Sequence, residues 1–418
     1  MGNEARMKPG EWGRALFQPE TFDWGRQDTD AWRQAWQQGL GERAVAEPLG
    51  AAPLHLQPDL NARLHTRALA LVAWLHQHRA HWQQPGDPEM DVLSADLAVV
   101  HDPAHPSGWD VRWVEFQAFT SVAATVDWLH TLAAAQWPDV AALDPHGAGL
   151  APPDWTQAWR AWAAGGQSSA QVRVLEHAPQ RQRTRWDFVA LQQRHGWAVA
   201  EPGDLQPAGR EGLQCRLTGQ PVTALVNRLV PPAYPARDGS AWPALQAQPG
   251  VRWHSPPALY ERVHKGLMPA WHAADTSQRL EAADVTAWTQ LGCAPEDLVL
   301  KACLGLGGTG VELHPSLDRL EALARQAAPG AWMVQRRYQP LPVMVADDGV
   351  PVGLEIRLML DTRQPLQPVC MSRVGRLSRL GAGAKANAGS WRGLPGEGVA
   401  LLLSPRGLRE SPASPMAV

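Results

Sequence analysis

The sequence has no long apolar run. Its longest apolar stretch with a helical pattern, residues 68–75, is far shorter than the roughly 20 residues that a membrane-spanning helix requires. The N-terminal stretch MGNEARMKPGEWGRALF contains no apolar segment of the kind found in a signal peptide. We therefore expect no signal peptide, no membrane partner and a cytoplasmic location.

Cysteine, tyrosine and phenylalanine are scarce. The four cysteines, at positions 215, 293, 303 and 370, form no CxxC pair, which argues against a zinc site or a disulfide framework and fits a reducing compartment. The chain has 3 tyrosines and 5 phenylalanines, but 21 tryptophans. We therefore expect tryptophan to fill core and groove positions that other aromatic residues usually share.

Neither sign of charge dominates the composition. The formal net charge is −3, and the sequence has no polybasic block. This balance gives no electrostatic reason to expect a nucleic acid partner or binding to a membrane surface. With 44% apolar residues in 418, the chain has the composition of a soluble globular protein of two or three domains.

The first part of the chain divides into segments of different class. Residues 1–90 have a helical pattern, in which Trp32 and Trp36 are spaced four apart and share one helix face. Residues 91–135 give a strand, a turn-rich loop, a second strand and a helix. Residues 136–170 are rich in proline, glycine, alanine and serine, which favours a linker.

The second part of the chain combines strands and helices. Residues 171–245 alternate strand, helix and strand, which is typical of a small α/β layer. Residues 246–403 contain a strand, a glycine-rich loop, a second strand and then a helix with Ser316 as its N-cap, followed by further strands. Residues 404–418 have the composition of a disordered tail. The fold class predicted for the whole chain is α+β.

The stretch LVLKACLGLGGTGVEL, residues 298–313, places four glycines between two strand-like segments. Glycine has no Cβ, so backbone N–H groups in such a loop can approach phosphate oxygens closely. Lys301 lies just before the glycines and can supply a positive charge to the same phosphates. We therefore predict a phosphate-binding hairpin, and a simple flexible turn is the alternative. The glycines are Gly305, Gly307, Gly308 and Gly310.

Three better-known glycine motifs do not fit this loop. The glycines match GxGxxG, but a dinucleotide-binding motif needs a helix to begin inside it, and Pro315 would block that helix. A Walker loop has its lysine after the glycines, whereas Lys301 precedes them. A protein kinase would need VAIK, HRD and DFG motifs, and the sequence has none.

A cluster of polar residues lies far upstream, in the stretch RWVEFQAF. Alternate residues of a strand share a face, so Glu115 and Gln117 point together and away from their apolar neighbours. If the preceding strand pairs with this one through a turn centred near Pro106 and Ser107, Asp96 lies opposite Gln117. These three oxygen donors would suit Mg²⁺. The alternative is the solvated outer face of a hairpin, and Asp91 or Asp102 could replace Asp96.

The order of these motifs, DLAVV and VEFQAF early and VLKACLGLGGTGV late, resembles the ATP-grasp superfamily. More narrowly, it resembles the circularly permuted branch typified by glutathionylspermidine synthase-like ligases. The similarity covers roughly residues 90–395 and includes ERVHKGLM, WMVQRRYQPLPV, GLEIRLML and MSRVGRLSR. It implies a circularly permuted ATP-grasp fold with a metal-binding hairpin in 91–135, a small α/β pre-ATP-grasp domain in 171–245 and the ATP-binding part in 246–403. Residues 1–90 form a helical N-terminal region beside it.

The resemblance also implies an activity, its cofactors and its site. ATP would phosphorylate a small-molecule or peptide carboxylate, and an amine would attack the acyl phosphate, so the chain would be an ATP- and Mg²⁺-dependent carboxylate–amine ligase. Lys265 and Lys301 would hold the ATP phosphates, the four glycines would cover them, and Gln335 would lie at the adenine hinge. Arg357 would act with Lys301 in catalysis. The implied metal ligands are Asp96, Glu115 and Gln117.

The sequence departs from the family pattern in three places. Gln117 stands where the metal motif has asparagine, the acidic residue often seen before Arg228 is missing, and no amidase domain precedes the ligase part. We assign Ser121 and Arg373 to the acceptor site because they lie close to the matched motifs. For Arg228 we expect either a role in the same site or a buried ion pair at the end of a strand. Two alternatives stay open: an ATP-grasp scaffold that binds nucleotide without turnover, and a small-molecule phosphotransferase. The sequence does not specify the oligomeric state.

Overall fold

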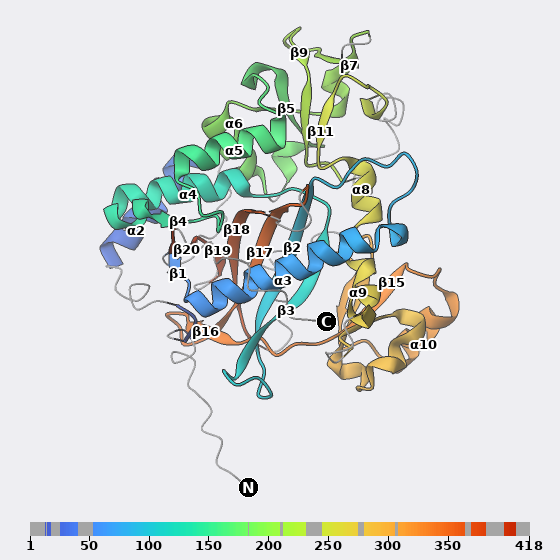
Figure 1. Cartoon of the computed structure of the whole chain (residues 1–418). Coiled ribbons are helices and arrows are strands. Elements are labelled where there is room, and N and C mark those ends of the chain that lie inside the picture. Colours follow the sequence, from blue (N-terminus) through green and yellow to red (C-terminus); the bar gives the residue numbers. More distant parts are fainter. Residues whose placement is uncertain are drawn as a thin grey trace.

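The structure is a computed structural model with helices on a central antiparallel sheet (Figure 1). The described residues also form two four-stranded and two three-stranded sheets. None of its described helices has an apolar stretch long enough to cross a membrane. It describes residues 13, 15–17, 26–40, 53–182, 184–209, 212–230, 245–274, 280–305, 308–363, 369–381 and 397–406.

The central sheet joins strands from both halves of the chain. Its order is β19-β18-β17-β2-β3, with β16 on β17, and every described pair in it is antiparallel. β2 therefore pairs with both its hairpin partner β3 and the much later β17, which brings the early polar cluster beside the late strands. The strands are β2 (Val92–His101), β3 (Trp109–Gln117), β16 (Pro342–Val345), β17 (Pro351–Asp361), β18 (Val369–Arg379) and β19 (Gly398–Ala400).

The two faces of this sheet have different coverings. Leu93, Leu97 and Ile356 pack in one apolar core with Leu64 and Leu71 of α3 (Pro58–Gln77), which lies across the sheet in Figure 1. The opposite face carries Met359 and Val374, which join a second core with helices α2 (Arg26–Leu40), α4 (Ala123–Gln136) and α5 (Pro152–Ala164). Because alternate strand residues face opposite ways, the polar residues between the α3-facing positions also point to this second face.

A four-stranded parallel sheet lies at the top of Figure 1, and its order is β11-β10-β5-β6. Helix α6 (Arg185–His195) connects β5 to β6 and ends at Gly196, which has a φ of 71° in the left-handed region that glycine tolerates. The strands are β5 (Val172–Leu175), β6 (Ala198–Ala200), β10 (Ala224–Asn227) and β11 (Arg252–His254). A small antiparallel sheet, β7 (Leu205–Pro207), β8 (Leu213–Cys215) and β9 (Pro221–Val222), adjoins them.

The predicted glycine hairpin lies in a separate antiparallel sheet, with order β12-β15-β13-β14. Helix α10 (Leu317–Gln326) contributes Leu320 to the core of this lobe, and the Ser316 hydroxyl accepts the Arg319 N–H at 3.2 Å, so the predicted N-cap is confirmed. The strands are β12 (Ala282–Asp284), β13 (Leu298–Ala302), β14 (Val311–Leu313) and β15 (Trp332–Arg336).

Short elements complete the described chain. A three-stranded sheet has the order β1-β20-β4, with β1 (Leu54–His55), β4 (Leu143–Asp144) and β20 (Leu402–Pro405). The remaining helices are α8 (Pro257–Arg262) and α9 (Met268–Ala274). The 3-10 turns are η3 (Arg79–His81), η4 (Pro138–Ala142), η5 (Ser169–Gln171), η6 (Pro179–Arg181), η7 (Pro202–Asp204), η10 (Lys265–Leu267), η11 (Val285–Leu291) and η12 (Pro295–Asp297).

Two predictions about segments are wrong. The stretch 136–170 is no linker, because α5 buries Trp155, Trp159 and Trp162 in the second core. Residues 404 and 405 are not part of a tail, because Leu402–Pro405 form β20 between β1 and β4; residues 407–418 lie outside the described part of the chain. Composition suggested loops in both places, and tertiary packing overrode it.

Candidate functional site

A cavity of about 910 Å³ lies where the three main sheets meet. It receives side chains from the central sheet, from the glycine-hairpin sheet and from the loops that follow the parallel strands. Its polar lining includes Glu115, Gln117, Ser121, Glu176, Arg228, Lys301, Gln335, Glu355, Arg357 and Arg376, together with Gly305 and Gly308 of the hairpin. Most of the residues predicted from motifs therefore converge on one space.

The hairpin register differs from the predicted one. Asp96 pairs with Glu115, not with Gln117, and Gln117 pairs with Ser94. The register shifts after this pair, because Leu97 is next opposite Trp113 and Val114 is left as the extra residue of a β-bulge. Glu115 and Gln117 do share the face that lines the cavity, as strand periodicity predicted.

The bulge supplies backbone acceptors to Lys301. The Lys301 Nζ donates to the Val114 carbonyl at 2.7 Å and to Gln335 Oε1 at 2.6 Å, and Gln335 Nε2 donates to the Trp113 carbonyl. Lys301 is 6% exposed. Burial lowers its pKa to about 8, helped by the nearby Lys265 and opposed by the Glu115 carboxylate. A buried ammonium group at the cavity wall is stabilised by an opposite charge, so Lys301 can bind an anion that enters the cavity.

Lys265 links the early hairpin to the glycine hairpin. Its Nζ lies 3.3 Å from Glu115 Oε2 and donates to the Gly305 carbonyl at 2.7 Å. η10 places this lysine, and the ring of His264 caps the turn by accepting the Gly266 N–H. Lys265 is buried and lies behind Glu115 and Gly305, which themselves line the cavity.

The glycine loop forms the hairpin predicted between β13 and β14, and the next helix, α10, begins only after Pro315. A Cβ on Gly305 would lie 2.3 Å from the Thr309 carbonyl oxygen, so glycine is required there. Gly310 has a φ of 71° and packs against Ala302. Gly310 does not line the cavity although Gly305 and Gly308 do, and Gly307 lies outside the described residues.

Asp96 is the anion of a buried charge network beside the cavity. Arg357 binds it through two 2.7 Å hydrogen bonds, and Arg376 donates to the same carboxylate and also pairs with Glu355. Burial alone raises the pKa of Asp96, but the two guanidinium groups outweigh it and hold that pKa far below its ordinary value. Asp96 is 2% exposed and does not line the cavity. Both of its oxygens are thus engaged by arginine in this structure.

Strand spacing separates the two arginines of β18. Arg376 pairs with Glu355 and faces the cavity, whereas Arg373 pairs with Leu358, on the α3 side of the sheet. Arg373 is buried there against Asn61 and donates to the Asp144 carbonyl at 2.8 Å. The structure therefore does not bring Arg373 to the cavity. Sequence reasoning missed Glu355 and Arg376, although Glu355 lies two residues before Arg357 and the period of a strand could have found it.

Ser121 and Arg228 line the cavity from two different elements. The Ser121 hydroxyl accepts from Arg357 Nη1 at 3.2 Å. Arg228 pairs with the buried Asp187 of α6, whose carboxylate also accepts the Thr125 hydroxyl at 2.7 Å near the start of α4. This ion pair ties the parallel sheet to the helices beside the central sheet.

The types of side chain that line the cavity suit a nucleotide and a hard cation such as Mg²⁺. Lys301, Arg357 and Arg376 bring positive charge to the cavity, and the oxygen atoms of Glu115 and Gln117 face it from one strand. Within the described residues, no group of three or more His, Cys, Asp or Glu side chains is arranged to hold a metal ion. A cation here would therefore draw on few protein ligands, as Mg²⁺ does when phosphates and water complete its shell.

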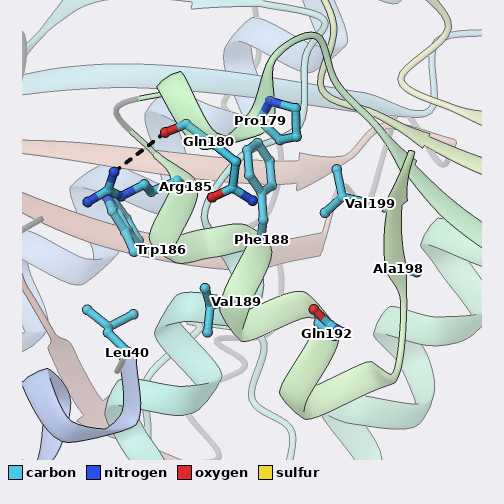
Figure 2. Close-up of a pocket in the computed structure, with 10 residues that line it drawn as sticks. All are labelled: Leu40, Pro179, Gln180, Arg185, Trp186, Phe188, Val189, Gln192, Ala198 and Val199. Carbon is cyan, nitrogen blue, oxygen red and sulfur yellow. Dashed lines mark hydrogen bonds between the residues drawn. The ribbon is translucent and has the colours of Figure 1, made fainter. Parts of the chain in front are cut away.

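A second cavity, of about 240 Å³, lies against α6 (Figure 2). Leu40, Phe188, Val189 and Val199 line it, and its one charged side chain, Arg185, donates to the Gln180 carbonyl at 3.5 Å. Neither a carboxylate nor a lysine is among its lining residues. It lacks the chemistry of the larger cavity.

Comparison with known proteins supports the fold. No family model matches the chain, and no curated protein matches it either. A candidate gamma-glutamylcysteine synthetase from Methylobacillus flagellatus KT covers 78% of this chain and 85% of its own at 12% identity, with a TM-score of 0.33, and we draw no conclusion from it. A glutathione synthetase-like effector from Globodera pallida aligns over 86% of this chain and 96% of its own, with 13% identity and a TM-score of 0.51. The chain thus shares a mixed α/β fold with this glutathione synthetase-like protein.

Proposed function

We propose that the protein is an ATP- and Mg²⁺-dependent ligase that joins a carboxylate to an amine through an acyl phosphate. The observation that carries the proposal is the convergence of Lys301, Arg357 and Arg376 with the Glu115–Gln117 strand under the glycine hairpin. A fold shared with a glutathione synthetase-like protein agrees with it. The acid is a small molecule or peptide, and the cavity of about 910 Å³ can hold a nucleotide with a small acid beside it.

The positive side chains answer the main difficulty of this chemistry, which is to bring an anionic acid to an anionic nucleotide. Bound ATP and Mg²⁺ would supply the phosphoryl group and part of the charge that offsets its oxygens. Lys301 would bind phosphate oxygens in place of Val114 and Gln335, and Lys265 would do so in place of the Gly305 carbonyl. Arg357, already fixed by Asp96, would orient the acid and stabilise the charge of the transferred group.

Three residues would complete the site. Glu115 and Gln117 would hold the cation, with Asp96 keeping the neighbouring arginines in place. The hairpin from Gly305 to Gly310 would cover the phosphates with backbone N–H groups and exclude water from the acyl phosphate.

The first experiment finds the acid without knowledge of the amine. The full chain is incubated with ATP, Mg²⁺, hydroxylamine and single acids from a panel of amino acids, γ-glutamyl peptides and dicarboxylates. Hydroxylamine attacks acyl phosphates directly, so hydroxamate and ADP should form together with the correct acid.

Calorimetry of ATP binding, with and without Mg²⁺, then tests the metal ligands. We expect binding to require Mg²⁺ and to weaken at least about 10-fold in Glu115→Ala, because loss of a residue that only supports a metal ligand already costs about 10- to 100-fold. Tight ATP binding without ADP formation for any acid would instead identify a nucleotide-binding module. A stable phosphorylated product that resists hydroxylamine would identify a phosphotransferase.

A further inference from the structure

The cavity extends to the carboxyl edge of the parallel sheet. In the order β11-β10-β5-β6, the strands β6 and β10 lie on opposite sides of β5. The chain thus adds β6 on one side of β5 and the later strands on the other, so the strand order reverses at β5. Ligands of parallel α/β sheets bind in the crevice outside the carboxyl ends of the strands at such a point. Glu176 directly follows β5, Arg228 directly follows β10, and both line the cavity. The topology therefore places two charged side chains where a second ligand fits.

Glu176 is a buried carboxyl group at this edge. It is 6% exposed, and its Oε1 accepts the His177 N–H at 2.8 Å. Arg228 is 5% exposed, and its Nε has no hydrogen-bond partner although its terminal nitrogens bind Asp187 and Thr184. Trp186 also lines this region. A buried carboxyl group is costly to keep in a protein, and none of the roles assigned above uses it.

The charges of the two ends of the cavity differ in a way that suits the two substrates. Lys301, Arg357 and Arg376 are cations where ATP and the acid, both anions, would react. At the other end Arg228 is paired with Asp187, and Arg181 is exposed to solvent. The buried Glu176 carboxyl group is therefore what can attract a cation there and repel those anions. An amine reaches a protein at neutral pH as its ammonium ion, so it is the reactant that fits this end.

We propose that the carboxyl edge of the parallel sheet binds the amine substrate, a primary amine that arrives as an ammonium ion, and that Glu176 accepts its proton. This inference rests on the proposed ligase function. The nitrogen lone pair then forms the C–N bond to the acyl carbon, and the C–O bond to phosphate breaks with its electron pair leaving on phosphate. The second nitrogen proton goes to the departing phosphate. Glu176 finally returns its proton to water.

The surroundings of Glu176 fit a proton acceptor near neutral pH. Burial raises the pKa of Glu176 to about 7, while the His177 N–H and the charge of Arg228 oppose that rise and Glu201 adds to it. Arg181, at the end of η6, also lines this part of the cavity. The best general bases have pKa values near the pH at which they work.

The test compares two nucleophiles in Glu176→Gln. Hydroxylamine is already unprotonated at neutral pH and needs no base, whereas methylamine, ethanolamine, glycine and spermidine arrive as ammonium ions. With the acid found by the hydroxamate screen, we expect Glu176→Gln to lower amide formation with the best of these amines about 100-fold or more. Hydroxamate formation should change less than about 3-fold. The matched control is Glu321→Gln, an exposed carboxylate of α10 outside the cavity lining, which should change neither rate.

The pH profile gives a second readout. In the wild type, amide formation should rise with pH through about 7 as Glu176 ionises, and Glu176→Gln should lose that limb. Equal loss of both products, or of neither, overturns the proposal, as does a wild type that makes hydroxamate but accepts none of the four amines. If the wild type forms no hydroxamate with any acid, the proposed ligase function itself fails. Near-ultraviolet circular dichroism, strong in a chain with 21 tryptophans, checks that each variant is folded.

Discussion

The two ends of the cavity obtain their charged side chains in different ways. At the cationic end, Glu355 and Arg357 alternate along β17, and Arg376 faces them from β18 within the same antiparallel sheet. At the other end, Glu176 and Arg228 stand just after strands of a parallel sheet. An antiparallel sheet presents polar residues along one face, whereas a parallel sheet presents them at its carboxyl edge. Residues that share a face of an antiparallel sheet can be found from the two-residue period of a strand. Residues that meet at the carboxyl edge of a parallel sheet can be found only when the order of the strands is known.

The strongest perturbation of the cationic end is Lys301→Ala. The variant removes the buried ammonium group and leaves the Val114 carbonyl and Gln335 without their shared donor. We expect ADP formation to fall about 100- to 1,000-fold, the range found when one preorganised donor to a developing charge is removed. Coupled detection of ADP measures the rate. Arg319→Ala, an exposed cation of the same lobe, is the control, and full activity of Lys301→Ala would contradict the proposed function.

Asp96→Asn tests whether the same end depends on a buried anion for its stability. The substitution leaves Arg357 and Arg376 without the charge that they share, so we expect a loss of about 3–5 kcal/mol in the free energy of unfolding. Denaturant titration measures it, and Asp30→Asn, at an exposed ion pair, should cost less than about 1 kcal/mol.

The pH dependence of that loss has a definite sign. The folded-state pKa of Asp96 is lowered, so its contribution to stability is fully present above its ordinary pKa and is lost progressively as the pH falls from that value through the lower folded-state pKa. The difference between wild type and Asp96→Asn should therefore shrink in acid. A difference that does not depend on pH would mean that the carboxylate charge is not the cause.

Gly305→Ala perturbs the cover of the cationic end without removing a charge. The new Cβ would meet the Thr309 carbonyl at 2.3 Å, so the hairpin must shift, and the Lys265 bond to the Gly305 carbonyl shifts with it. We expect ATP affinity to fall about 10-fold, roughly 1.4 kcal/mol. Gly203→Ala, where a Cβ meets nothing within 4 Å, is the matched control. Equal ATP affinities of Gly305→Ala and Gly203→Ala in calorimetry would show that the hairpin does not contribute to ATP binding.

The smallest effect separates the two ends by pH. Lys301, whose pKa burial lowers to about 8, loses its charge as the pH rises through that value, so ATP affinity of the free enzyme should fall several-fold between pH 7 and 9. Glu176 ionises as the pH rises through about 7, below the range in which Lys301 loses its charge, and it lies at the other end of the cavity. Glu176→Gln should therefore leave the pH profile of ATP affinity unchanged. A profile that moves in Glu176→Gln would show that the two ends are not independent.

Much of the cationic end could be predicted from the sequence. The alternation in VEFQAF placed Glu115 and Gln117 on one face, and the glycines after Lys301 predicted a hairpin between two strands. Both inferences use local periodicity and backbone freedom, which neighbouring residues alone decide. The register of the first hairpin was predicted wrongly, because the turn lies closer to β2 than expected and pairs His101 with Trp109. The bulge at Val114 then places Asp96 opposite Glu115.

What the sequence by itself determined is which residues share a strand face and where glycine is needed, since both depend on spacing of a few residues. Only the tertiary structure decided that β2 pairs with β17, so that Asp96 is bound by Arg357 and Arg376, and that Arg373 points to α3 while Arg376 points to the cavity. It also decided that Glu176 belongs to the same cavity. These contacts join residues far apart in the chain, and their geometry depends on strand order and packing, which no local pattern specifies.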